Sequence, residues 1–137
     1  PATQVEALNR LDFDTVMFPL NFVLRRHRRP ENDYEPLLRL AEERDVGTIA
    51  IKAIAKRPWQ TETHAYNTWY EPFDEPEDIN RSIWFALSQG ITSAVMASDT
   101  RLISKELEAA KRFRRLSEDD ESRLLEKAAE LQPLFPR

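Results

Sequence analysis

The segment Val46-Gly47-Thr48-Ile49-Ala50-Ile51-Lys52-Ala53-Ile54 decides the fold class. It is apolar at nearly every position, which is typical of a strand that is buried on both faces, as in a parallel sheet. Two other segments have the composition of strands, residues 13–21 before it and residues 91–96 after it. The chain therefore contains three predicted strands.

Segments with a helical period separate and flank these strands. Each places apolar residues three or four positions apart, as on one face of an amphipathic helix. The predicted buried stripes are Val5, Leu8 and Leu11; Tyr34, Leu37, Leu38 and Ala41; Ile79, Ile83, Ala86 and Leu87; Ile103, Leu107 and Ala110; and Leu124, Ala128 and Leu131. The alternation of strands and helices predicts consecutive units of a parallel α/β barrel.

Helix-end signals agree with these stripes. Pro76 stands at the favoured first position of a helix, and Gly90 suits the residue that follows the end of that helix. Residues 98–100 supply candidate N-caps for the next helix. Ser117, with Asp120 three residues later, forms a capping-box pattern before the last one.

The length of the chain limits how much of a barrel it can form. The 137 residues can bury one core, yet a complete eight-stranded α/β barrel takes roughly 250. No linker divides residues 1–137, so we interpret them as one domain or one portion of a domain. The chain begins with Pro1 and leads at once into a helical pattern, which we expect of a truncated or processed product.

Composition excludes several classes of function. The chain has 20 Lys and Arg against 24 Asp and Glu, a net charge of −4, so we expect no general attraction to nucleic acid. It has no Cys, which excludes disulfides, thiolate metal sites and a Cys nucleophile. No apolar run reaches the length of a membrane span, and the first residues do not resemble a signal peptide. We expect a cytoplasmic protein that does not enter a membrane.

Residues at the carboxyl ends of the predicted strands are the candidates for function, because parallel α/β folds bind ligands there. These are Asn21, Lys52, Lys56 and residues 98–101. A desolvated amine at a strand end must find a partner or lose its proton, so Lys52 is a candidate contact for a substrate or phosphate group. The alternative is that Lys52 extends into solvent or pairs with a carboxylate.

The turn at residues 97–101 lies between the third strand and a helix N-terminus, where free amides and the helix dipole favour an anion. Asp99 would repel phosphate there unless its side chain turns into the cap, and simple capping is the alternative interpretation. Arg101 is the predicted phosphate contact, through its bidentate fork.

Other motifs carry weaker signals. The basic run at residues 25–29 is short and lacks interleaved aromatics, so we interpret it as a solvated loop. His27 and His64 do not form a ligand pair, so no metal site is predicted. Residues 56–74 form a long loop whose aromatic side chains either wall an apolar pocket or seal the rim of the fold. These aromatic residues are Trp59, Trp69, Tyr70 and Phe73.

A resemblance to a known family rests on three segments in order. They are Phe13-Asp14-Thr15-Val16-Met17-Phe18-Pro19-Leu20-Asn21, then residues 37–53 ending in Ile51-Lys52-Ala53, then Ala86-Leu87-Ser88-Gln89-Gly90-Ile91-Thr92. This order resembles the C-terminal half of aldo/keto reductases. Trp69-Tyr70-Glu71-Pro72-Phe73 and residues 130–135 resemble a bacterial-type subgroup of that family.

The resemblance implies a partial (β/α)8 TIM barrel, made of about the last three βα units and a C-terminal helix. It implies an NADP(H)-dependent oxidoreductase that reduces a small carbonyl substrate, with the catalytic Tyr, Lys, Asp and His on the first four strands, in an N-terminal half that is missing here. Tyr34, Tyr66 and Tyr70 do not match the catalytic Tyr, so no catalytic residue is assigned and the isolated chain is predicted to be inactive.

The same resemblance places the cofactor-holding half in this chain. Lys52, Ser98 and Arg101 are the cofactor-side candidates that it implies. Met17 and Ile51 depart from the residues that many members of the family use to contact the nicotinamide.

An alternative from another class is a non-catalytic half-barrel that serves as a binding or assembly module. A half-barrel leaves two edge strands unpaired and the inner face of its sheet uncovered. We expect such a module to self-associate through these exposed surfaces.

Overall fold

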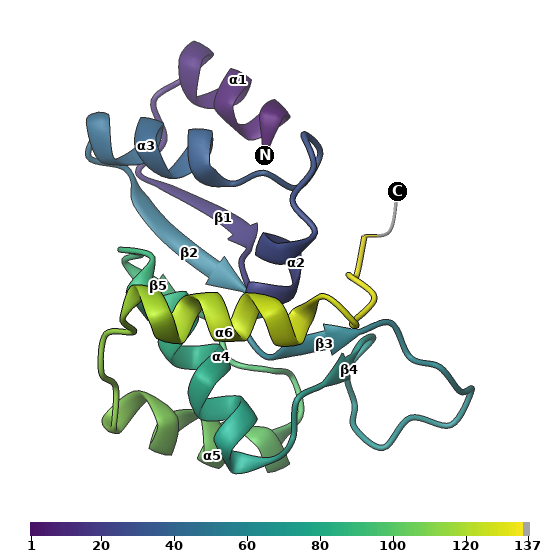
Figure 1. Cartoon of the computed structure of the whole chain (residues 1–137). Coiled ribbons are helices and arrows are strands. Elements are labelled where there is room, and N and C mark those ends of the chain that lie inside the picture. The colour runs from purple at the N-terminus through teal and green to yellow at the C-terminus, as the bar shows by residue number, and fades with distance from the viewer. Residues whose placement is uncertain (136–137) are drawn as a thin grey trace.

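The structure is a computed structural model that describes residues 1–135, and helices alternate with strands along the chain (Figure 1). The helices are α1 (Ala2–Arg10), α2 (Phe22–Arg26), α3 (Glu35–Glu43), α4 (Pro76–Ser88), α5 (Thr100–Lys111) and α6 (Glu118–Ala128). The strands are β1 (Thr15–Pro19), β2 (Gly47–Ile51), β3 (Ala55–Arg57), β4 (Glu71–Pro72) and β5 (Ser93–Ala94).

The three predicted strands form one parallel sheet in the order β1-β2-β5. Met17 pairs with Ile49, and Ile49 pairs with Ser93 on its other side. The third strand is shorter than the predicted 91–96, although a hydrogen bond of 2.8 Å from Val95 N to Ala50 O extends its ladder. The prediction of parallel βα units is confirmed, and β1 and β5 form the edges of the described sheet.

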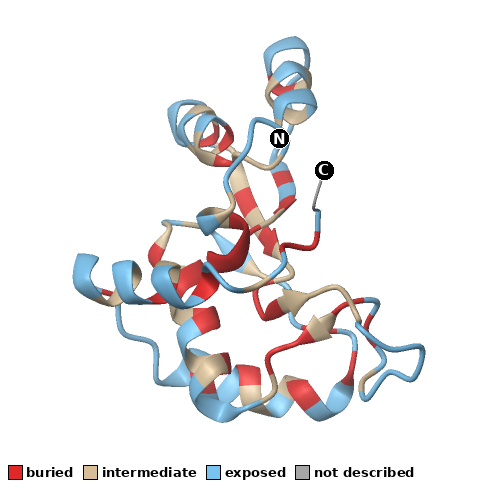
Figure 2. Cartoon of the chain, turned by 45° about the vertical axis from the view of Figure 1, so that its right-hand side comes forward, coloured by how far each residue is buried: buried red, intermediate tan, exposed pale blue. Residues whose placement is uncertain are grey.

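Only one face of this sheet is covered (Figure 2). We define the covered face by Val16, Phe18, Thr48 and Ala50, which are all buried, and the open face by Met17, Ile49, Ile51 and Ser93, which are half-buried or exposed. The side chains alternate between the faces because successive residues of a strand point to opposite sides. The prediction that residues 46–54 are buried on both faces is therefore wrong.

Helix α3 packs against β2, and α1 packs against α3 (Figure 1). Leu37 and Ala41 of α3 are buried as predicted, and the Tyr34 ring, just before α3, stacks on Phe18 with centroids 6.1 Å apart. Leu8 of α1 is buried, whereas Leu11 is 62% exposed, contrary to the predicted stripe. The reason is that α1 ends at Arg10 and Leu11 has an extended backbone, which takes its side chain off the helix face.

The predicted end signals of α4 and α6 are confirmed. Pro76 begins α4, and Gly90 beyond its end has a φ of 74°, a conformation that glycine adopts without steric cost. The Ser117 side chain caps α6 by accepting a hydrogen bond of 3.1 Å from Asp120 N.

The buried face of α5 differs from the predicted one by one position. The prediction used Ile103, Leu107 and Ala110, whereas the buried residues are Leu102, Glu106 and Ala109. Leu107 is exposed. The prediction was wrong because α5 buries a glutamate, Glu106, on its inner face. Hydrophobic periodicity places charged residues on the exposed face.

Two short features lie inside segments that were predicted to be loops. Helix α2 covers the start of the basic run, and the strands β3 and β4, which begin at Ala55 and end at Pro72, pair as an antiparallel hairpin. The chain between β3 and β4 projects away from the body of the molecule (Figure 1). Such short elements depend on contacts with distant residues and leave little periodic signal. Within residues 1–135, none of the helices has the length and apolar character that crossing a bilayer requires.

Candidate functional site

The carboxyl ends of β1, β2 and β5 meet at one edge of the sheet, because the three strands are parallel. Asn21 follows β1, Lys52 follows β2, and residues 97–101 follow β5. This edge therefore brings together the candidates that the sequence indicated from three separate segments.

Asn21 is a structural link at this edge. Its side chain is buried, its Oδ1 accepts a hydrogen bond of 2.8 Å from Leu24 N, and its Nδ2 donates one of 3.0 Å to Lys52 O. The first bond caps α2, and the second ties the end of β1 to the end of β2. Both polar atoms of the amide are used within the protein.

Lys52 is a half-buried cation that has no carboxylate partner within the described residues. Its Nζ lies 5.1 Å from the centroid of the Trp69 indole, in a cation–π contact. Burial lowers the pKa of Lys52, because desolvation disfavours the charged amine. The amine at this strand end is thus partly desolvated, as the sequence indicated. The alternative of a carboxylate partner is not observed among the described residues.

The backbone of Lys52 has a φ of 62°, the left-handed region that non-glycine residues rarely adopt. Such a conformation persists only where surrounding contacts hold it. Here the carbonyl of Lys52 accepts hydrogen bonds from Asn21 Nδ2 and from Ala55 N. These bonds hold the backbone of Lys52 at the carboxyl edge of the sheet.

In the turn after β5, the side chains of Asp99 and Arg101 bond to each other, and Asp99 also bonds to the start of α5. Asp99 is 5% exposed, and its carboxylate accepts hydrogen bonds from Arg101 N at 3.0 Å and Asn67 N at 2.7 Å. Arg101 pairs with Asp99 at 2.6 Å, and this guanidinium, with the backbone amides, holds the pKa of Asp99 well below its ordinary value. Asp99 is therefore the cap of α5, as the alternative interpretation expected.

Ser98 and Arg101 hold the loop that follows β3. Ser98 Oγ donates a hydrogen bond of 2.6 Å to Asn67 O, and Arg101 Nη2 donates one of 2.8 Å to Ala65 O. The Arg101 guanidinium also lies 4.8 Å from the centroid of the Tyr66 ring. Ser98, a cofactor-side candidate, and Arg101, the predicted phosphate contact, thus both engage the loop in this conformation.

The predicted aromatic set divides between two roles. Tyr70 and Phe73 are buried, and Phe73 stacks on Phe22 with centroids 5.2 Å apart, so these two seal the rim. Trp69 is 60% exposed beside Lys52. Trp59 donates its Nε1 hydrogen to Thr68 O at 2.7 Å and thereby closes the loop on itself.

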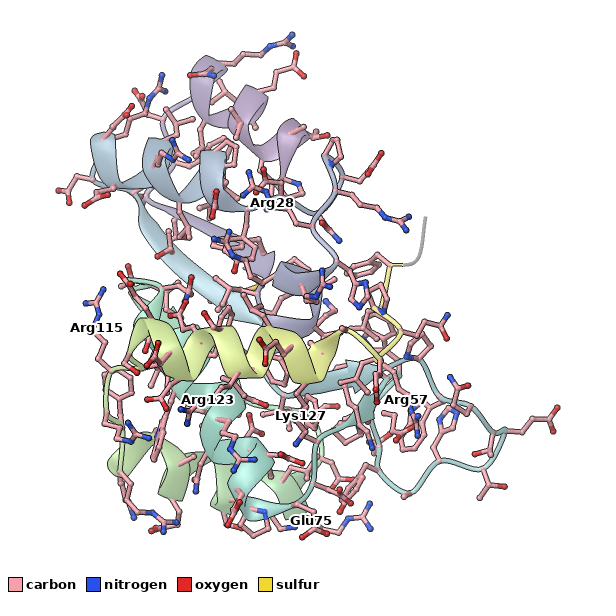
Figure 3. All side chains as sticks on the ribbon, viewed as in Figure 1. Arg28, Arg57, Glu75, Arg115, Arg123 and Lys127 are labelled. Atoms are coloured by element: carbon pink, nitrogen blue, oxygen red, sulfur yellow. The ribbon has the colours of Figure 1, made fainter. Side chains whose placement is uncertain are left out.

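Lys56, the remaining predicted candidate, belongs to the hairpin. Its Nζ lies 3.0 Å from Glu71 Oε1, and Arg57 (Figure 3) donates two hydrogen bonds to the same carboxylate at 2.7 and 2.9 Å. These contacts lower the pKa of Glu71, with the Arg57 hydrogen bond as the largest cause. Lys56 therefore holds β3 to β4.

Glu106 is a buried carboxyl group that the sequence did not single out. It is 2% exposed, and its Oε1 accepts a hydrogen bond of 2.9 Å from Ala97 N, directly below the turn after β5. Burial raises its pKa to about 7. Nothing in the local sequence distinguished Glu106 from the exposed acids of other helices.

The basic run and the histidines take part in structural contacts. Arg28 (Figure 3) and Arg25 both form ion pairs with Glu35 at the start of α3. A ring nitrogen of His27 lies 3.0 Å from Ala128 O, and His64 stacks on Trp59. Among residues 1–135, no group of three or more histidines and carboxylates is arranged to hold a metal ion.

The fold and this edge define a class of structure: a three-stranded segment of a parallel α/β barrel with a candidate anion-binding edge. No protein-family model matches the sequence, and no curated protein matches it. Two solved structures match, the holo and apo forms of aldo-keto reductase AKR11C1 from Bacillus halodurans.

The holo form shares 15% identity with this chain at a TM-score of 0.60, and the apo form shares 16% at 0.58. Each match covers 100% of this chain and 49% or 50% of the reductase chain. The chain therefore has the fold of half of an aldo-keto reductase barrel and spans about half the length of the structures it matches. The expected fold class, a partial TIM barrel, is confirmed.

Proposed function

We propose that residues 1–137 form the C-terminal, cofactor-side portion of an aldo/keto reductase-type oxidoreductase that uses NADP(H) to reduce carbonyl groups. The observation that carries this proposal is the match of the whole chain to half of such a barrel. When bound, the nicotinamide supplies the hydride for this chemistry. The proton donor and its partners lie, on this proposal, in the N-terminal half of the barrel.

The strand ends fit an anionic cofactor at one point. Lys52 offers a desolvated ammonium without a carboxylate partner, and Trp69 offers an exposed aromatic face beside it. A cation and a flat apolar surface together suit a phosphate group linked to an aromatic ring. The role of this chain would be to bind and orient the cofactor.

The turn at residues 98–101 does not accept an anion in its present arrangement. The Asp99 carboxylate occupies the start of α5, and the donors of Ser98 and Arg101 are engaged by residues 65–67. Their proposed cofactor contacts require the loop to withdraw, which would release both donors.

A titration of the isolated chain with NADPH tests the proposal. We expect weak, saturable binding that Lys52→Met lowers about tenfold, because one charged contact is lost. Lys111→Met is the matched control, since Lys111 pairs with Glu108 on the surface of α5. Titration with NADH in parallel measures the contribution of the 2′-phosphate.

Two results would count against the proposal. One is equal binding by Lys52→Met and Lys111→Met. The other is robust carbonyl reduction by the isolated chain, because the proton donor would then have to be a residue to which we assign a structural role.

A second candidate function is a non-catalytic half-barrel that self-associates. The observation that favours it is the open face, where Met17 is 49% exposed on β1, one of the two edge strands of the described sheet. Sizing chromatography with light scattering separates the candidates. A uniform dimer supports the assembly module, whereas a monomer or heterogeneous aggregates oppose it.

A further inference from the structure

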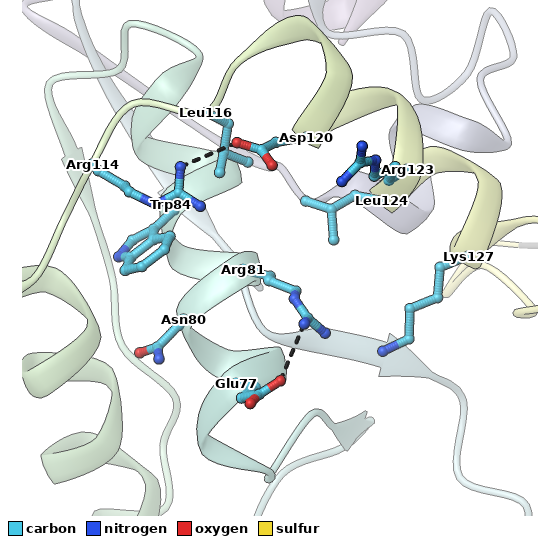
Figure 4. Close-up of a pocket in the computed structure, with 10 residues that line it drawn as sticks. All are labelled: Glu77, Asn80, Arg81, Trp84, Arg114, Leu116, Asp120, Arg123, Leu124 and Lys127. Carbon is cyan, nitrogen blue, oxygen red and sulfur yellow. Dashed lines mark hydrogen bonds and ion pairs between the residues drawn. The ribbon is translucent and has the colours of Figure 1, made fainter.

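A groove of about 480 Å³ lies between α4 and α6, on the helical layer of the fold (Figure 4). Its walls are residues of the two helices and of the segment that leads into α6, and no strand residue lines it. Its volume falls within the range of small-molecule sites, about 300–1,000 Å³. The function proposed above does not use this groove.

Four cations line the groove in a chain whose net charge is −4. They are Arg81 on α4, Arg114 before α6, and Arg123 and Lys127 on α6. Two acids, Glu77 and Asp120, also line it, so the four cations exceed the acids by two in a chain whose net charge is negative.

Three of these cations have carboxylate partners. Arg81 and Lys127 extend toward one another from the two helices, and Arg81 pairs with Glu77 at 3.1 Å (Figure 4). Both cations also contact Asp78 Oδ1, at 3.3 and 2.6 Å. Arg114 pairs with Asp120 at 3.1 Å. These contacts hold the walls of the groove in place.

Arg123 is the exception. Among residues 1–135 its guanidinium forms no ion pair and no hydrogen bond, although it lines the groove beside paired cations. A guanidinium presents five donors in a planar fork, which matches a carboxylate or phosphate in two parallel hydrogen bonds. An anion in the groove would satisfy these donors.

The groove also has an apolar floor. Leu116 and Leu124 are buried there, and the Trp84 ring packs beneath the Arg114 guanidinium, 5.0 Å from its centroid. Trp84 is itself fixed, because its Nε1 donates a hydrogen bond of 2.8 Å to Ala109 O. The Trp84 ring is thus fixed in the groove that Arg123 also lines.

We propose that this groove binds a small organic anion, with its carboxylate or phosphate group on Arg123 and a flat apolar group against Trp84 and Leu124. The charge of the ligand is compensated by the unpaired guanidinium, and its apolar group packs against the half-buried Trp84 ring and Leu124. The paired residues Arg81, Arg114 and Lys127 shape the site.

The test uses phenyl phosphate as the probe, with phenol and inorganic phosphate as its two halves. We expect saturable binding of phenyl phosphate, shifts of the Trp84 indole signal in NMR spectra, and clearly weaker binding of either half alone. Arg123→Gln should lower the affinity about tenfold, since charge-assisted hydrogen bonds are lost.

Arg115→Gln is the matched control, because Arg115 is also an exposed arginine but does not line this groove (Figure 3). Arg123→Lys, which keeps the charge and loses the fork, should retain part of the affinity. The proposal is overturned if phenyl phosphate does not saturate, or if Arg123→Gln and Arg115→Gln reduce binding equally.

Discussion

On the covered face of the β1-β2-β5 sheet Phe18 is fully buried against Tyr34, whereas Met17, one residue earlier in β1 and on the open face, is half exposed. The two side chains are similarly apolar, so the sequence does not distinguish them. The difference shows that a strand composed for burial on both faces is buried only where a helix covers it. A complete barrel would cover the second face by curving the sheet upon itself.

The largest effect that tests this comparison is expected from Phe18→Ala. Removal of a fully buried ring loses its transfer free energy and leaves a cavity, so we expect a loss of about 3–5 kcal/mol in the free energy of unfolding. Met17→Ala is the control and should cost less than about 1 kcal/mol. Urea denaturation measures both, and equal losses would show that the open face is covered in solution.

Glu106→Gln tests what burial under the helices does to a charge. Burial raises the pKa of Glu106 from 4.5 to about 7, so the folded protein binds this proton more tightly than the unfolded chain does. The contribution to stability is complete below pH 4.5 and is lost as the pH rises through 7.

The substitution should therefore change little at pH 4.5 and should stabilise the protein by about 3 kcal/mol at pH 8. Thermal unfolding across this range measures the effect. Glu108→Gln, on the exposed side of the same helix, is the control. A gain that does not depend on pH would show that Glu106 is not the titrating group.

A smaller effect on stability is expected from Asp99→Ala, in the turn that follows β5 at the carboxyl edge of the sheet. The change removes the cap of α5 and the acceptor of the Asn67 amide, so we expect the melting temperature to fall by about 4 °C and the loop to loosen. Hydrogen exchange at Asn67 reports the second effect. Asp119→Ala in the first turn of α6 provides a comparison, and identical exchange at Asn67 in both variants would contradict the assignment.

The smallest effect on folding is expected from Met17→Glu, because its side chain already meets water. We expect a change of about 0.5 kcal/mol or less in the free energy of unfolding. If the open face mediates self-association, the same variant should be monomeric, because a buried unpaired carboxylate is costly. Light scattering of the unsubstituted chain and of Met17→Glu decides this point. A dimer that persists in the variant would exclude the open face as the interface.

The sequence predicted those features that depend on neighbouring residues. The apolar runs around Val16 and Ile51, the Pro76 start and Gly90 end of α4, and the Ser117 cap were all confirmed. Each depends on backbone preferences or hydrogen bonds within a few positions, so the local pattern contains the necessary information. Lys52 was singled out in the same way, because a single charge at the end of an apolar run is itself a local signal, and burial lowers its pKa in the structure.

Other features could be seen only in three dimensions. The burial of Glu106, the hairpin of β3 and β4, and the use of Ser98 and Arg101 to hold residues 65–67 all join segments that are distant in the sequence. A periodicity argument assigns apolar residues to the interior and polar residues to the surface. It has no means of recognising a polar side chain whose partner lies on another element.

The sequence by itself determined the order of the three parallel strands and the longer helices, and with it the parallel α/β class, because hydrophobic periodicity and helix-end residues act locally. Only the tertiary structure decided which face of each strand is buried, which cations at the strand ends remain without a carboxylate, and where α4 and α6 leave a groove. These properties depend on what packs against a residue, and the same apolar strand is buried or exposed according to whether a neighbouring layer covers it.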